Sequence, residues 1–123
     1  MKARLLQSFD DPSLGAEQWE NVLARGATET VFLLHPYQRA WWNCFGHGQL
    51  LLITAEKQGQ IVALAPLFAE AGMIFFVGSG GSDYLDFIGD TSNPGVFDVL
   101  LEAARSRVSD LNDANIKNLP RYE

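Results

Sequence analysis

One stretch of sequence decides the fold, Gln49-Leu-Leu-Leu-Ile-Thr-Ala-Glu-Lys-Gln-Gly-Gln-Ile-Val-Ala-Leu-Ala-Pro-Leu-Phe-Ala69. Two strand-like runs, 49–56 and 60–69, are separated by Lys57-Gln58-Gly59, where the glycine supplies the positive backbone angle that a tight hairpin needs. Both faces of the second run are apolar, which predicts a central strand that is covered on both sides. Pro66 predicts a local break in the ladder of that strand.

On the C-terminal side, Ala71-Gly72 predicts a second turn and Met73–Val77 a third strand, so the hairpin extends into an antiparallel meander. The meander ends at the glycine-rich loop Gly78-Ser-Gly-Gly-Ser82, which is followed by Tyr84–Ile88.

Ser92-Asn93-Pro94 then supplies a cap and a first-turn proline for a last helix. Its apolar stripe is predicted to be Phe97, Leu100, Leu101, Ala104 and Val108. From Ser109 the tail is predicted to begin as a turn, with a further strand around Ile116–Leu119.

On the N-terminal side, Ala3–Phe9 predicts a first strand, which ends at the turn-forming cluster Asp10–Ser13. A helix is predicted over Ser13–Arg25, because Trp19, Val22 and Leu23 lie at helical spacing, with Gly26 as a left-handed C-terminal cap.

The segment Thr28–Leu34 is either a strand or a connector, and His35-Pro36 opens a second helix that closes at Gly46. The pattern predicts one aromatic core face on this helix, made by Tyr37, Trp41 and Phe45 with Ala40 and Cys44.

The composition limits the classes of partner. Nine basic and fifteen acidic residues give a net charge of −6, and no basic stripe is present to neutralise phosphates, so nucleic acids and anionic membranes are poor partners. The longest apolar runs are much shorter than the roughly 20 residues of a membrane span. With 123 residues the chain is expected to be a single domain, residues 1–123.

The expected location is cytoplasmic. The N-terminus lacks the apolar core of a secretory signal, and the single cysteine, Cys44, cannot form an internal disulfide. The fold class expected from the order of elements is α/β, more narrowly α+β, with a mainly antiparallel central sheet flanked by helices.

Several motifs occur in an order that resembles a known family. They are Arg39-Ala-Trp-Trp-Asn-Cys-Phe-Gly46, Ile61-Val-Ala-Leu-Ala-Pro-Leu67, Val77-Gly-Ser79 and Ser82-Asp-Tyr-Leu-Asp86. Together they are similar to the N-terminal region of the CelD/BcsL-type GNAT acetyltransferases, which are related to the FemABX peptidyl transferases. The resemblance extends from about residue 28 to residue 120. Members of the family are usually much longer, so the chain is expected to be an incomplete GNAT-like module.

The resemblance implies an activity: transfer of an acetyl or similar acyl group from a coenzyme A thioester to an amine or hydroxyl acceptor. It implies acetyl-CoA as the donor, a small-molecule or glycan-related acceptor, and a link to bacterial cellulose biosynthesis. The chain would supply the acceptor-side part. The Arg/Gln-x-x-Gly-x-Gly/Ala turn with which the GNAT fold holds the donor's pyrophosphate at a helix N-terminus is not found in the sequence.

The expected site residues lie in and after the glycine-rich loop. Gly78, Gly80 and Gly81 would allow close approach of the acyl donor, or the loop is only a turn that leaves a strand. One carboxylate, Asp83 or Asp86, would act as a general base and Tyr84 as a proton donor to the departing thiolate. If residues 83–86 are extended, the two aspartates lie on opposite sides, so both cannot easily serve one site. In the alternative, the tyrosine packs its ring and the aspartates cap turns or face water.

Two other groups of residues allow more than one interpretation. Cys44 and His47 have a spacing that occurs in zinc sites, and His35 is a further candidate ligand. Inert packing of the Cys44 thiol and a role for His35 at the start of the helix are favoured instead, and no metal is expected. Trp41 and Trp42 either line a ligand groove or pack, Trp41 in the core and Trp42 under the meander or at an interface. The rival function is a non-catalytic module that dimerises through an exposed sheet edge or binds a partner chain.

Overall fold

The computed structural model describes residues 1–26, 33–78, 87–90 and 94–114, with side chains of the last helix from 95 to 107. In chain order the elements are β1 Lys2–Leu6, the 3-10 turn η1 Pro12–Leu14, α1 Ala16–Leu23, α2 His35–Phe45, β2 Gln49–Lys57, β3 Gln60–Glu70, β4 Met73–Phe76, β5 Ile88–Gly89 and α3 Pro94–Ala114. The chain is therefore α+β, as expected from its sequence.

The strands form one antiparallel sheet in the order β1-β2-β3-β4, with β5 also paired to β3. Both predicted hairpins are confirmed, because φ is positive at the two central residues of each turn: 55° at Gln58 and 78° at Gly59, then 54° at Ala71 and 79° at Gly72. Positive angles at both positions match the right-handed twist of the paired strands.

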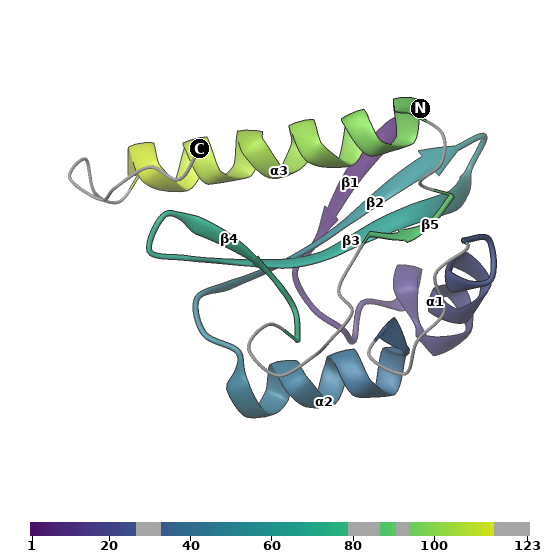
Figure 1. The fold of residues 1–123 in the computed structure, drawn as a ribbon, viewed down its shortest axis with the longest axis horizontal. Helices are drawn as coiled ribbons and strands as arrows, with labels where there is room; N and C mark the ends of the chain where they lie inside the picture. The colour runs from purple at the N-terminus through teal and green to yellow at the C-terminus, as the bar shows by residue number, and fades with distance from the viewer. Residues whose placement is uncertain (27–32, 79–86, 91–93, 115–123) are drawn as a thin grey trace.

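Helices cover both faces of the sheet, with α3 on one face and α1 and α2 on the other (Figure 1). This confirms the prediction that the second strand of the hairpin is central. Leu64 and Phe68 of β3 pack toward α1 and α2, whereas Ala63, Ala65 and Leu67 belong to the core beneath α3.

The predicted break at Pro66 is wrong for the ladder between β2 and β3. Pro66 stands opposite Leu52 in unbroken register, and the irregularity lies between Ala55 and Glu56 instead. The carbonyl of Pro66 accepts a hydrogen bond from the N–H of Val77 at 2.9 Å. Because the N–H and C=O of one residue point to the same neighbouring strand, the donor that proline lacks faces away from β2.

The predicted first helix is confirmed in its core residues, since Trp19, Val22 and Leu23 are buried on α1. The left-handed cap at Gly26 is wrong: α1 ends at Leu23, its cap residue Ala24 is in the right-handed region, and Gly26 has no positive φ. A Cβ added at Gly26 would lie 2.6 Å from the carbonyl oxygen of Gly89. This glycine therefore allows close packing of the end of α1 against β5.

The predicted core face of α2 is wrong, although the helix begins and ends as predicted. The buried residues are His35 and Gln38, whereas Tyr37 and Trp41 are half-buried and Phe45 is 62% exposed. The two small residues of the predicted face are exposed as well, Ala40 and Cys44. His35 packs against Trp19 of α1, and this contact turns the side of the helix that holds positions 35, 38 and 42 toward the sheet.

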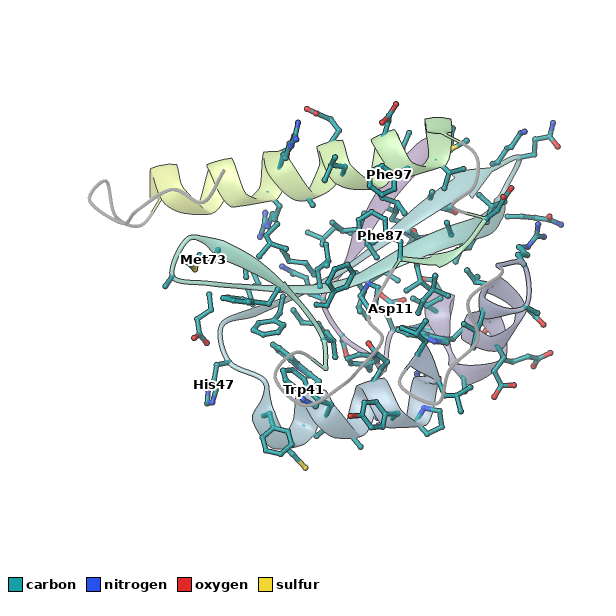
Figure 2. The ribbon with its side chains drawn as sticks, in the orientation of Figure 1. Asp11, Trp41, His47, Met73, Phe87 and Phe97 are labelled. Atoms are coloured by element: carbon teal, nitrogen blue, oxygen red, sulfur yellow. The ribbon has the colours of Figure 1, made fainter. Side chains whose placement is uncertain are left out.

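The last helix is longer than predicted and its stripe is displaced. α3 continues to Ala114, where a turn was expected from Ser109. Val96, Leu100 and Ala104 are buried, but Phe97 is 42% exposed. The Phe97 ring reaches over the edge of the core to Phe87, with ring centroids 5.2 Å apart (Figure 2). The segments Thr28–Phe32, Tyr84–Asp86 and Ile116–Leu119 lie outside the described residues.

Candidate functional site

The glycine-rich loop predicted to carry the site begins at the end of β4. Gly78 follows the fully buried Val77 and has a φ of 100°, a conformation that favours glycine. The other predicted site residues lie outside the described part of the chain, namely Gly80, Gly81, Asp83, Tyr84 and Asp86.

Both ends of this loop are fixed to the same strand. On the side that leaves β4, Val77 donates its N–H to the carbonyl of Pro66. On the side that returns, Ile88 is 1% exposed and stands opposite Leu64. The loop therefore starts and finishes at positions of β3 only two residues apart, so its base is narrow and held by core residues.

A buried amide of α2 also holds the start of the loop. The Gln38 side chain is 0% exposed, and its Nε2 donates to the carbonyl oxygen of Val77 at 3.2 Å. A hydrogen bond inside an apolar core is costly to remove, because the carbonyl that remains loses its partner without regaining water. Gln38 therefore fixes the last residue before Gly78 against α2.

His35 lies beside this contact in an aromatic cage. Its ring meets Trp19 and Phe9 edge-on, with ring centroids 5.4 and 5.8 Å away. Burial lowers the pKa of His35, the nearby Arg39 charge lowers it further, and a hydrogen bond to the backbone of Phe9 opposes both effects. The other ring nitrogen, Nε2, has no hydrogen-bond partner. A neutral imidazole 6% exposed is suited to packing rather than to proton exchange with a substrate.

The residues considered for a metal site differ in burial. His35 is buried, whereas Cys44 and His47 are exposed, and the side chain of His47 is labelled in Figure 2. Within the described ranges, three or more metal-binding side chains do not gather anywhere. The thiol of Cys44 is not packed in the core, so that part of the packing interpretation is wrong.

A polar groove of about 430 Å³ lies between α1 and the tip of the β2–β3 hairpin. Its floor holds Val22 and Ile61, and Arg25 donates to the Oε1 of Gln60 across it at 3.2 Å. The rest of its lining is mostly polar: Arg4, Ser13, Gln18, Asn21, Glu56 and Gly59. Two arginines and one glutamate line the groove, so its net formal charge is only +1.

Aromatic side chains from α2, β3 and β4 gather around Phe68 of β3. Trp41 and Trp42 both contact Phe68, at 5.6 and 5.5 Å between ring centroids, and Phe68 stacks on Phe75 at 5.3 Å. Trp41 also contacts Phe45 at 5.8 Å. Both tryptophans are half-buried and pack against the core, so Trp41 lies at the edge of the core rather than inside it. We call Trp41, Phe45 and Phe75 the α2–β4 aromatic surface.

No family model, curated protein or solved structure matches the chain. Among the described helices, none has the length and hydropathy that crossing a bilayer requires.

Sequence reasoning missed the roles of Gln38 and Arg107. A glutamine on an amphipathic helix is ordinarily a solvent-facing residue, and only the displaced face of α2 buries Gln38. The side chain of Arg107 lies against the sheet on α3, where its Nε has no hydrogen-bond partner. The sequence carries one signal for Arg107. Val96, Leu100 and Ala104 are buried at intervals of four residues, and position 107 follows three residues later, so it lies on the same face of the helix.

Proposed function

We propose that the chain is the acceptor-side part of a GNAT-like acyltransferase of the CelD/BcsL type. The acceptor's amine or hydroxyl attacks the carbonyl of a coenzyme A thioester, the carbon–sulfur bond breaks, and the thiolate takes a proton. A carboxylate, Asp83 or Asp86, accepts the proton of the acceptor, and Tyr84 donates one to the thiolate. Gly78, Gly80 and Gly81 give the donor close access to the backbone.

The narrow base of the loop supports this proposal best. A loop that carries a site needs fixed ends, because a small displacement of a reacting group lowers the rate greatly. Val77 is held by Pro66 and by Gln38, and the returning strand is held by Leu64. The strands and helices also follow one another in the order that the sequence predicts. The proposal includes a cytoplasmic location and an acceptor of small-molecule or glycan type.

The test is release of coenzyme A from acetyl-CoA in the presence of a panel of amine and sugar acceptors. Tyr84→Phe and Asp86→Asn should each lower turnover at least tenfold, since one general acid or base typically contributes a hundredfold or more. The control is Asp98→Asn, which makes the same charge change at an exposed position of α3. Turnover that is unchanged in both site variants would remove these residues from the mechanism.

The α2–β4 aromatic surface favours a second candidate, a module that dimerises through β4. Phe45 is 62% and Phe75 36% exposed, and β4 ends the described order of strands, with its outer edge unpaired there. Neither β4 nor the segment 41–45 contains a charged residue, so a second copy could pair there without repulsion in a chain of net charge −6.

Light scattering after size-exclusion chromatography tests the dimer. Phe75→Thr should shift a concentration-dependent dimer to monomer, because it removes apolar area beside the open edge. Phe97→Thr is the matched control, since Phe97 is 42% exposed on the other side of the sheet. A wild-type chain that stays monomeric over the accessible concentrations would rule this candidate out.

A further inference from the structure

A second groove lies at the opposite edge of the sheet, between β1 and α3. Its volume is about 250 Å³, and no residue of the α2–β4 aromatic surface lines it. It is lined by the strand residues Ala3, Arg4, Leu5 and Ile53 and the helix residues Ala103, Ser106 and Arg107. Because β1 is the first strand in the described order, one side of this groove is open to solvent.

The floor of the groove is apolar. Ala3 and Leu5 face α3 and pack against the core beneath it, and Ile53 behind them is 1% exposed. Arg4 lies between them in the strand, so its side chain points to the other face, and Arg4 also lines the groove beside α1. Ala103 is the helix residue above this floor, and its small side chain leaves the space open.

The helix side of the groove provides a charge without an acceptor. The Nε of Arg107 is buried and has no hydrogen-bond partner. An ionised N–H that has lost water and gained no acceptor is unfavourable, and a carboxylate is the group that matches a guanidinium best. Ser106 also lines the groove, and none of the described residues that line it is acidic.

We propose that this groove binds an aliphatic carboxylate of about the length of hexanoate. The carboxylate accepts hydrogen bonds from the Arg107 guanidinium and the Ser106 hydroxyl, and the hydrocarbon chain lies over Ala3, Leu5 and Ile53. A phosphate would use the guanidinium but leave the apolar floor uncovered, and a cation would meet Arg107 unfavourably. The proposal does not depend on the acyltransferase function, because it uses none of the residues proposed for that function.

The test is a titration of the isotope-labelled chain followed by two-dimensional NMR with three probes: hexanoate, hexanol and acetate. Hexanoate should cause saturable shifts of the amide signals of Leu5, Ile53 and Ala103. Hexanol lacks the charge and acetate lacks the chain, so each should bind at least tenfold more weakly. Equal affinity for hexanol, or no saturable shift with hexanoate in a chain with a dispersed spectrum, would overturn the proposal.

Two variants locate the site. Arg107→Gln should weaken hexanoate binding at least tenfold, whereas Arg105→Gln, the same change at an exposed position of α3, should leave it unchanged. Ala103→Leu should block the groove and weaken binding without any change of charge. If Arg107→Gln unfolds the chain, Ala103→Leu and the comparison of hexanoate with hexanol and acetate still test whether the groove binds an aliphatic carboxylate. Undiminished binding by Ala103→Leu would overturn the proposed location.

Discussion

Replacing Gln38 by leucine should destabilise the chain, because leucine has a similar volume but cannot donate a hydrogen bond. The Nε2 donor lies 3.2 Å from the carbonyl oxygen of Val77, and both residues are 0% exposed, so water does not replace the lost partner. A buried polar group left without a partner costs about 1–3 kcal/mol. That is a large part of the roughly 5–15 kcal/mol with which a domain is ordinarily stable.

Urea unfolding followed by tryptophan fluorescence measures this loss. The chain has three tryptophans, and Trp19 is fully buried, so its emission reports unfolding. The control is Gln18→Leu on the exposed side of α1, where the two residue types have similar helix propensity and the expected change is within about 0.5 kcal/mol. A Gln38→Leu variant as stable as this control would refute the idea that the amide holds the end of β4.

Two further predictions concern the aromatic cage and the contact between α1 and β5. Burial lowers the pKa of His35 from 6.5, so the unfolded chain binds more protons, and stability should fall as the pH drops below about 6.5 and level off below the folded-state pKa. Urea midpoints at several pH values should show this dependence weakened in His35→Phe and retained in His47→Asn. Gly89→Ala should destabilise the chain more than Gly59→Ala in the same assay. Both glycines have positive φ, so the backbone strain of alanine is common to the two variants. An added Cβ at Gly89 would lie 2.5 Å from the carbonyl oxygen of Val62, whereas one at Gly59 would meet nothing within 4 Å. Equal losses in the two glycine variants would contradict the close-contact explanation.

The sequence predicted the meander well because its turns are local. Gln58-Gly59 and Ala71-Gly72 each adopt the positive angles that a two-residue hairpin turn requires, and the apolar run between them makes β3 central. Such features depend on neighbours along the chain, so they can be recognised without knowledge of the packing.

The errors arose where contacts distant in the sequence decide the outcome. The face of α2 is set by the packing of His35 on Trp19, and Gly26 serves a close approach to Gly89 rather than a helix cap. Pro66 interrupts no pairing with β2, because its missing donor faces the other side of β3. Hydrophobic periodicity cannot identify such partners, since several apolar stripes on one helix fit the same pattern.

For the candidate site, the sequence indicated where the loop begins but not how it is held. Gly78 stands at the end of β4 with a positive φ, as expected of a glycine-rich turn. The anchoring of Val77 by Gln38 requires residues 39 positions apart to meet. The groove beside Arg107 requires β1 and α3 to pack together from opposite ends of the chain.

Calorimetric titration of the purified, folded chain with acetyl-CoA tests the acyltransferase proposal most directly. The proposal predicts saturable binding in the micromolar range, which Gly80→Val should abolish by blocking approach to the backbone, and which Gly59→Val at the hairpin tip should not change. Absence of binding by a chain with an intact cooperative unfolding transition would contradict a donor-contacting role for the loop. That result would leave the chain as an acceptor-side part without donor contacts or as the dimerising module.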